Sequence, residues 1–200
     1  MLLYTRYPQT NVFVEDLRSC ISPEYLTDGI IDASLHLLFS GRDDVQCLPA
    51  SVVSVLFSDK VTRKKININN KKVILLPWCQ DRHWRLIVVK LADSKWYLID
   101  PMGSRSEENI NRIQEDVIKP FIQRFSKNPV QYNEMEENCP RQVDMFSCGS
   151  SIVQYGASLV DGKSVFEMDD SFTYRDKIIS RLIDQPLPNL LSYFCSYCGI

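Results

Sequence analysis

Three apolar segments in the middle of the chain, joined by short polar turns, limit its possible folds more than any other feature. They cover residues 72–78, 83–91 and 95–100, and they are rich in β-branched and aromatic side chains, which is typical of strands. The residues between them, Gln80-Asp81-Arg82 and Ala92-Asp93-Ser94, favour tight turns. The sequence therefore predicts three consecutive strands that form an antiparallel sheet.

Helical patterns flank these strands. Residues 1–24 carry no regular pattern, residues 129–135 alternate like an edge strand, and two prolines precede an apolar tail at residues 186–200. Because no internal repeat is present, we expect one α+β domain over residues 1–200. Apolar periodicity, with helix-start and helix-stop residues, predicts helices over residues 25–39, 49–57, 106–125 (kinked at Pro120), 148–160 and 171–183.

Composition excludes several classes of function. The net charge is −2, and residues 60–72, the one dense basic stretch, indicate a charged loop rather than a nucleic-acid interface. Seven cysteines, an odd number without framework spacing, indicate free thiols in a reducing compartment. No segment has the pattern of a signal peptide or the length of a membrane span. We therefore expect an intracellular protein, cytoplasmic or nuclear, that binds neither nucleic acid nor membrane.

Metal binding receives no support from the cysteines either. Cys195 and Cys198 form a Cys-x2-Cys pair, but no second pair stands at zinc-site spacing. We expect no metal and no cofactor.

Cys148 is the strongest single candidate for chemistry. It stands where polar loop residues give way to an apolar helical segment, so it lies at or near a helix N-terminus. Unpaired N–H groups at such an end stabilise a thiolate. Gly149 is expected to leave room for a substrate carbonyl. Taken alone, however, a free cysteine is more often a small buried side chain.

His83 and Asp100 strengthen the case for Cys148. His83, one of two histidines, begins the second predicted strand, and Asp100 ends the third. In a hairpin both side chains lie at the same open end, where an aspartate can orient an imidazole and stabilise its protonated form. Taken separately, Asp100 before Pro101 is a common way to open a turn.

Gln142 and Trp84 complete the set of candidates. Gln142 precedes Cys148 by six residues, and its side-chain amide, together with the Cys148 backbone N–H, could bind an oxyanion. Trp84 follows His83 directly and either belongs to the core or covers a narrow substrate channel. A base, an orienting acid, an oxyanion donor and a thiol are what acyl transfer at a peptide bond requires.

These motifs resemble one family. The His-Trp pair, an Asp 17 residues after the His, and Gln-x5-Cys-Gly are similar to the ubiquitin-like-protein proteases, the Ulp/SENP cysteine peptidases. A second match is Tyr25-Leu26-Thr27-Asp28-Gly29-Ile30-Ile31, which looks like the family's Trp-Leu-Asn-Asp-x-Ile-Ile segment. The resemblance spans about residues 22–184. Papain-type enzymes are excluded because they carry the Cys before the His.

The resemblance implies a fold, an activity and a partner. The fold would be an α+β protease with a central, mostly antiparallel sheet flanked by helices and the nucleophile at a helix N-terminus. The activity would be hydrolysis after the C-terminal Gly-Gly of a ubiquitin-like modifier, SUMO first and a Nedd-type modifier or ubiquitin next, by a monomer. By resemblance, Cys148 is the nucleophile, His83 the base, Asp100 the orienting acid and Gln142 the oxyanion donor, while Trp84 and Tyr25 are the channel walls and Asp28 contacts the modifier.

Four positions depart from the family pattern. Ser147 stands where the family usually has Asp, and Asp144 where it often has Asn. Pro101 replaces the usual Ser, and Tyr25 replaces the expected Trp at one channel wall. None of these changes removes a catalytic atom. Two other functions remain open: a protein acetyltransferase of the same clan, and a module that binds a modifier without cutting it.

Overall fold

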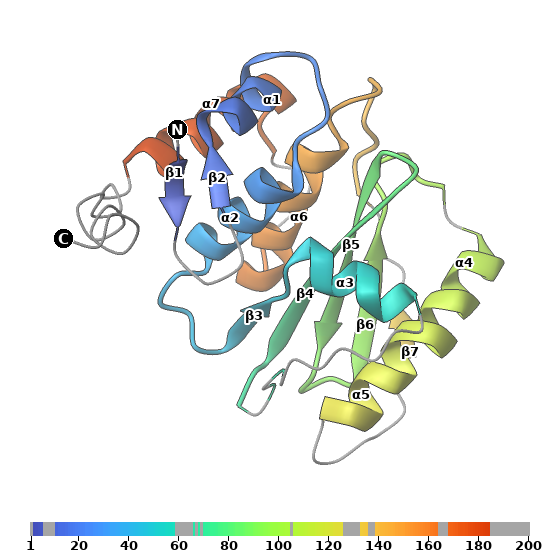
Figure 1. The fold of residues 1–200 in the computed structure, drawn as a ribbon. Coiled ribbons are helices and arrows are strands. Elements are labelled where there is room, and N and C mark those ends of the chain that lie inside the picture. Colours follow the sequence, from blue (N-terminus) through green and yellow to red (C-terminus); the bar gives the residue numbers. More distant parts are fainter. Residues whose placement is uncertain are drawn as a thin grey trace.

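The computed structural model describes residues 2–5, 11–58, 66, 68, 70–104, 106–125, 133–135, 139–163 and 168–184. A five-stranded mixed sheet lies at its centre and is covered by helices (Figure 1). Most of the basic stretch at residues 60–72 and all of the apolar tail at 186–200, with Cys195 and Cys198, lie outside the described residues.

The predicted hairpins form the middle of the sheet. β4 pairs antiparallel with β5, and β5 pairs antiparallel with β6. The outer strands add two short parallel pairs, β3 on β4 and β7 on β6, of which β3 was not predicted. In sheet order the strands are β3 (Val45–Cys47), β4 (Val73–Gln80), β5 (His83–Lys90), β6 (Lys95–Ile99) and β7 (Asn133–Met135).

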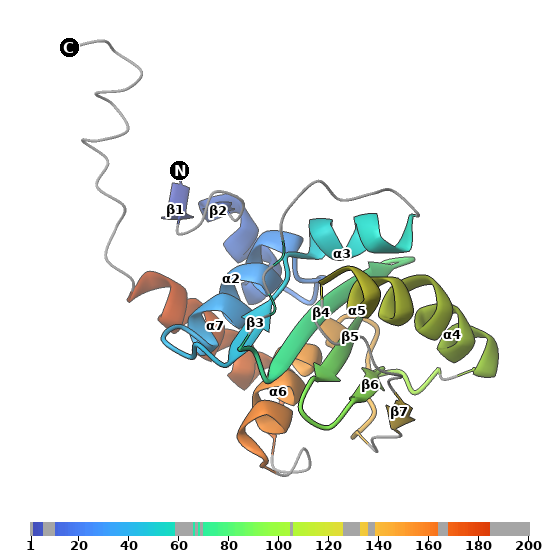
Figure 2. The same cartoon turned by 90° about the horizontal axis from the view of Figure 1, so that it is seen from below.

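Helices cover both faces of the sheet (Figure 2). One face carries α2 (Asp28–Leu38), α6 (Cys148–Asp161) and α7 (Ser171–Ile183). The other carries α3 (Ala50–Phe57) and a helix that runs through α4 (Glu107–Arg112), a π-helical stretch (Ile113–Ile118) and α5 (Lys119–Phe125). The expected distortion near Pro120 is this π-helical stretch, which ends two residues before the proline. A proline lacks the N–H that a regular helix needs, and π-turns accommodate such a defect.

Two hydrophobic clusters explain why the strands are apolar throughout. Alternate residues of a strand point to opposite faces of a sheet. Leu75, Leu86 and Val88 pack toward α2, α6 and α7, whereas Ile74 and Ile87 pack toward α3 and α5. All five are fully buried, so both faces of the central strands are covered by hydrophobic core.

α2 begins later than the apolar pattern predicts. Its N-cap is Thr27, whose hydroxyl accepts a hydrogen bond from the Ile30 N–H at 3.4 Å. Such a side-chain acceptor satisfies one of the free N–H groups at a helix start. Tyr25 and Leu26 therefore precede the helix instead of forming its first turn, and they become available to line a pocket.

The N-terminal region is more regular than expected. Residues 1–24 include a two-stranded antiparallel sheet of β1 (Leu2–Thr5) and β2 (Asn11–Phe13), a 3-10 turn over Val14–Leu17, and α1 (Arg18–Ile21). The expectation of an irregular segment was therefore wrong. Such short elements gain little from their own sequence and depend on packing; Val12, for example, is fully buried.

No described helix has both the length and the apolar character to cross a membrane. Among the described side chains, no group of three or more His, Cys, Asp or Glu could hold a metal ion.

Candidate active site

Three elements meet at one end of the sheet. β5 begins at His83, β6 ends just before Asp100, and α6 begins at Cys148. The antiparallel register pairs Leu86 with Ile99, which brings the start of β5 and the end of β6 to the same edge. α6 packs along β5, so its N-terminus arrives at that edge too (Figure 1).

His83 and Asp100 form a close pair. Nε2 of His83 lies 2.7 Å from Oδ1 of Asp100, and both side chains are largely buried. Cys148 lies near enough to His83 to raise the pKa of its imidazole. Because Nε2 contacts Asp100, the other ring nitrogen is the one available to the thiol. The structure thus brings the predicted acid, imidazole and thiol together in that order.

The electrostatics of this group favour a charged imidazole. Burial lowers the pKa of His83, but Asp100 and Cys148 together outweigh burial and raise the pKa to about 9. Burial alone would raise the pKa of Asp100, whereas hydrogen bonds from His83, Arg85 and Ser104 hold that pKa well below its usual range. The predicted acid and imidazole therefore form a pair of opposite charges beside the thiol.

Cys148 is the first residue of α6, as predicted, and is fully buried. The turn before it is organised by Asp144, whose Oδ1 accepts the backbone N–H groups of Phe146 at 2.9 Å and Ser147 at 2.7 Å. The Ser147 hydroxyl donates to the other carboxylate oxygen of Asp144. The two departures at positions 144 and 147 are therefore partners, and together they hold the loop that carries the thiol.

Gln142 lies beside this loop. Its backbone N–H donates to the carbonyl of Pro101 at 2.8 Å, which ties the loop to the turn that follows Asp100. Its side-chain Nε2 donates to the carbonyl of Asp144 at 2.6 Å. An amide carries two N–H bonds, so one remains for an oxyanion. Its Oε1 is buried and has no hydrogen-bond partner among the described residues.

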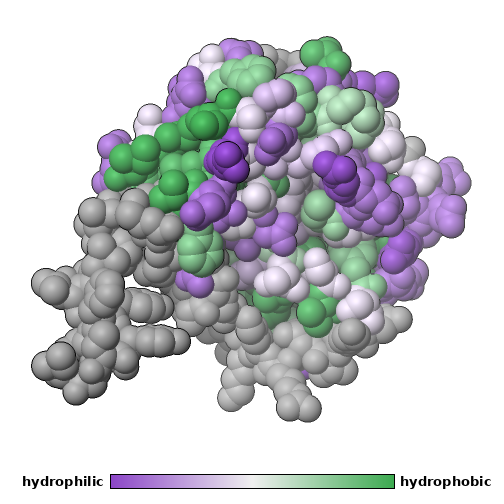
Figure 3. Space-filling model, turned by 45° about the horizontal axis from the view of Figure 1, so that its top comes forward, coloured by the Kyte–Doolittle hydropathy of each residue, from purple (hydrophilic) through white to green (hydrophobic). Residues whose placement is uncertain are grey.

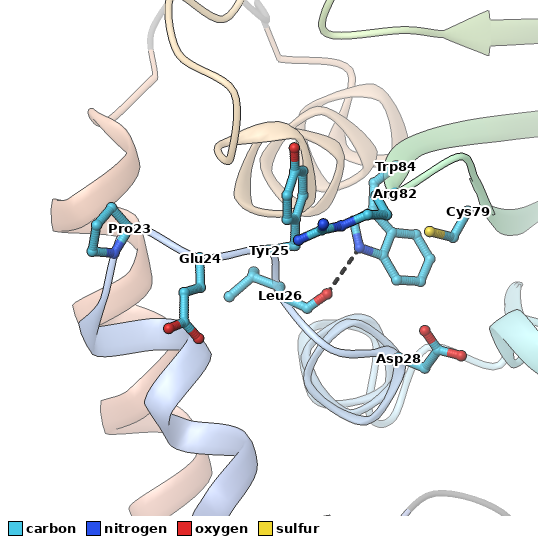
Figure 4. Close-up of a pocket in the computed structure, with 8 residues that line it drawn as sticks. All are labelled: Pro23, Glu24, Tyr25, Leu26, Asp28, Cys79, Arg82 and Trp84. Atoms are coloured by element: carbon cyan, nitrogen blue, oxygen red, sulfur yellow. Dashed lines mark hydrogen bonds between the residues drawn. The ribbon is translucent and has the colours of Figure 1, made fainter.

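A pocket of about 440 Å³ adjoins the three residues (Figure 4). Two lining residues connect it to them: Trp84 follows His83, and Leu26 packs against Gly149, which follows Cys148. The lining consists of Pro23, Glu24, Tyr25, Leu26, Asp28, Cys79, Arg82 and Trp84. The structure thus places three of the four predicted binding residues, Tyr25, Asp28 and Trp84, around one cavity, whereas Gly149 does not line it.

The walls of the pocket are held by different contacts. Trp84 is 1% exposed, and its indole N–H donates to the Leu26 carbonyl at 2.9 Å. The Arg82 guanidinium lies 4.8 Å from the centre of the Tyr25 ring and extends across the pocket (Figure 4). Asp81 and Arg82 both have positive φ, 52° and 61°, as a tight hairpin turn requires. This turn therefore aims Arg82 at Tyr25.

Gly149 has a packing role in the structure. A side chain at this position would meet the Leu26 Cβ at 3.0 Å and the Ile31 Cδ1 at 3.2 Å. Leu26 and Ile31 therefore occupy the space beside Gly149 where a Cβ would lie. Gly149 lets the start of α6 approach the pocket wall closely.

Two arginines that the sequence analysis did not single out support the site. Arg85 Nε donates to Oδ2 of Asp100 at 2.8 Å, and the strand register could have indicated this contact. Arg175 of α7 is fully buried and donates to four backbone carbonyls. Because these acceptors are main-chain atoms, no sequence pattern marks them; they belong to Ser19, Ser22, Glu24 and Phe146.

Arg175 links the pocket to the loop that precedes Cys148. Glu24 adjoins Tyr25 at the pocket wall, and Phe146 stands two residues before Cys148. Burial lowers the pKa of the Arg175 guanidinium, which four carbonyl acceptors nevertheless satisfy. One buried cation thus holds α1, the pocket wall and the loop together.

Solved structures share this fold. The C-terminal Ulp1 protease domain in complex with Smt3, the yeast orthologue of SUMO, matches with a TM-score of 0.75 and 16% identity, over 92% of this chain and 87% of that one. The Ulp1-like SUMO protease catalytic domain of Chaetomium thermophilum gives 0.72 and 15%, over 90% and 81%. A de-sumoylating protease gives 0.68 and 14%, over 98% and 95%.

Sequence comparison identifies the family directly. No protein of curated function matches the chain. The profile of the Ulp1 protease family, C-terminal catalytic domain, however, matches residues 55–183, a segment that contains His83, Asp100, Gln142 and Cys148. The chain therefore belongs to the Ulp1 protease family and is a cysteine protease.

Proposed function

We propose that this protein cleaves after the C-terminal Gly-Gly of a ubiquitin-like modifier, with a SUMO-type modifier as the first candidate. The observation that carries the proposal is the array of Cys148, His83 and Asp100 beside a pocket walled by Tyr25 and Trp84. The release of modifiers from target proteins and the trimming of modifier precursors use the same chemistry. Either reaction would suit this site.

The reaction follows from the positions of the groups. The Cys148 thiolate attacks the carbonyl carbon of the last glycine, and the oxyanion is met by the Gln142 side chain and the Cys148 backbone N–H. His83 gives its proton to the leaving amine, and the C–N bond breaks. A water molecule, deprotonated by His83, then hydrolyses the thioester and restores the thiol. Asp100 holds the imidazole in place throughout.

The pocket suits an extended tail without side chains. Tyr25 and Trp84 belong to separate segments but line one cavity, and Leu26 between them is locked by the Trp84 hydrogen bond. Glycines have no Cβ, so a channel with flat aromatic walls can admit them and exclude other residues. Asp28 is exposed at the start of α2 and lines the same pocket, and we expect it to contact the modifier beyond the channel.

The loop between Gln142 and Cys148 exposes apolar side chains to solvent. Val143 and Met145, which lie between Gln142 and Cys148, are strongly exposed. Figure 3 shows hydrophobic and hydrophilic side chains interspersed over one face of the molecule. Such mixed surface is compatible with a protein substrate.

The free cysteines support an intracellular site of action. Among the described residues, Cys20, Cys47, Cys79 and Cys148 are free thiols. Unpaired thiols persist in reducing compartments.

A panel of modifier-derived probes tests the proposal. Each probe carries an electrophile in place of the last carboxylate, on a SUMO-type, Nedd-type or ubiquitin tail. We expect an adduct at Cys148, formed fastest with the SUMO-type probe and absent in Cys148→Ala. An adduct with another modifier would correct the preference. Binding without an adduct would indicate a module that only holds the modifier, and acetyl transfer from a thioester without adducts would indicate the acetyltransferase.

Loss of Gln142 should slow chemistry more than binding. Gln142→Ala is expected to lower kcat roughly 10- to 1,000-fold with little change in KM, because one oxyanion donor is lost. Steady-state cleavage of a modifier precursor measures both constants. Gln142→Glu keeps the size of the side chain but removes its N–H donors, so it should be similarly slow. An unchanged kcat with a raised KM would make Gln142 a binding residue instead.

The pocket should select glycine. We expect precursors ending in Gly-Gly-X to be cut on the order of 100-fold faster than those ending in Ala-Gly-X or Gly-Ala-X. Tyr25→Ala should narrow this difference and lower kcat/KM, since a misplaced carbonyl loses its attack geometry. Tyr25→Trp, which restores the family's aromatic wall, is the matched control and should keep the selectivity. Equal cleavage of all three precursors by the wild type would rule out such a channel.

A further inference from the structure

Arg85 is a charged side chain in a buried row of the sheet. The β4–β5 register pairs Trp78 with Arg85, and the β5–β6 register, one step beyond Leu86 and Ile99, places Arg85 opposite Asp100. The three side chains therefore form one row across three strands. The Arg85 side chain is 15% exposed, and its guanidinium lies 5.2 Å from the centre of the Trp78 ring.

The two carboxylate oxygens of Asp100 have different partners. Oδ1 faces His83 Nε2 at 2.7 Å and also accepts the Met102 backbone N–H at 2.9 Å. Oδ2 accepts Arg85 Nε and the Ser104 hydroxyl, each at 2.8 Å. Rotation of the carboxylate would break the contacts of both oxygens at once. The contacts of Oδ2 with Arg85 and Ser104 therefore fix the orientation of the Asp100 carboxylate toward His83.

We propose that Arg85 is a positioning residue for the reaction, which fixes the Asp100 oxygen that meets His83 and takes up part of the charge of that carboxylate. The inference rests on the proposed function for its role in turnover. Arg85 does not touch the thiol or a substrate; it acts through Asp100. The ring of Trp78 on the neighbouring strand holds the Arg85 guanidinium against the carboxylate. Little additional side-chain entropy is therefore lost when the contact with Asp100 forms.

The charge of Arg85 has a predictable effect on His83. A guanidinium stays charged at every relevant pH, so it draws part of the negative potential of Asp100 away from the imidazolium. Without it the imidazolium would be better stabilised, and His83 would keep its proton to higher pH. Cys148 of α6 also acts on the pKa of His83, Cys79 of β4 lies near Arg85 and Cys148, and Arg141 lies over Gly103 in the turn after Asp100.

Two direct measurements test this role. The imidazole of His83 is titrated by NMR, with His36, the other histidine of the chain, as internal reference. kcat and KM for a modifier precursor are recorded over the same pH range. The NMR titration needs no substrate, so it still tests Arg85 if the modifier assignment fails.

Three variants separate charge from shape. Arg85→Met removes the charge and the hydrogen bond, Arg85→Gln removes the charge but can still donate to Oδ2, and Arg85→Lys keeps the charge without the planar fork. We expect the titration of His83 to move up by about half to one pH unit in the Met and Gln variants and to stay in place in the Lys variant. kcat should fall roughly 10- to 100-fold in Arg85→Met with KM little changed.

A purely structural arginine would give a different pattern. The melting temperature would fall, but the titration of His83 would be the same in all variants, and that result would overturn the proposal. An unchanged kcat in Arg85→Met would overturn it as well. If Arg85→Met does not fold, Arg85→Gln decides the question, because it loses the same charge while keeping a donor for Asp100.

Discussion

Cys148→Ala should abolish turnover while the protein stays folded. No other described group lies in contact with His83 and at the start of a helix, so no second nucleophile can take over the attack. Cys148 is fully buried, and alanine fits its site with the loss of one sulfur atom, a change of about 1 kcal/mol in the free energy of unfolding. Cleavage of a modifier precursor, followed over hours, measures the activity, and thermal melting measures the fold.

Cys20→Ala is the matched control for this variant. Cys20 is as buried as Cys148, but burial raises its pKa to about 11, and no imidazole faces it. Its removal should leave kcat within about twofold of the wild type, since a buried thiol without a base is chemically inert. Full activity in Cys148→Ala, or loss of activity in Cys20→Ala with an intact fold, would refute the assignment of the nucleophile.

Asp100→Asn is expected to have the second largest effect. The amide matches the carboxylate in shape but cannot stabilise an imidazolium, and kcat should fall by roughly 10³- to 10⁴-fold, as for the orienting aspartate of other triads. The variant also leaves Arg85 without its anionic partner at a largely buried position. Breaking such a pair costs about 3–5 kcal/mol in the free energy of unfolding.

The pH dependence gives a sharper test of Asp100. In the wild type burial lowers the pKa of His83, but Asp100 and Cys148 together outweigh burial and raise this pKa to about 9, so activity should decline only above this pH. In Asp100→Asn the carboxylate no longer counteracts the lowering of the His83 pKa by burial. The pH above which activity declines should therefore move down toward the ordinary histidine pKa of about 6.5. His83→Gln is the companion variant and should show no decline of this kind. A basic limb that stays near pH 9 in Asp100→Asn would mean that Asp100 does not govern His83.

Much of this site could be predicted because local sequence determines it. The central hairpins follow from long apolar runs and strong turn residues, and the hairpin register then brings the start of one strand next to the end of another. His83 and Asp100 therefore meet for reasons that act within 20 or so residues. The helix after Cys148 is equally local, because its apolar periodicity and Gly162 at its end define it.

Other features depend on packing that no local pattern records. β3 is three residues long and forms only because the edge of β4 offers it a partner. The N-terminal elements are as short, and the carbonyls at Ser19, Ser22 and Glu24 are held by Arg175, more than 150 residues away in the chain. Such elements are stabilised by contacts with distant parts of the chain rather than by the secondary-structure preference of their own residues.

The pocket and the contacts of Asp100 were likewise predicted only in part from the sequence. The sequence alone determined which residue types could act, in which order along the chain, and that Tyr25, Asp28 and Trp84 were candidates for substrate contact. Only the tertiary structure decided three contacts between separate segments. Leu26 packs against Gly149, the Arg82 guanidinium lies over the Tyr25 ring, and Arg85 donates to the Asp100 oxygen that does not face His83. The physical reason is that the backbone preferences of a segment depend on residues that are neighbours in the sequence. A side-chain contact between distant segments forms only after packing of the core has brought these segments together.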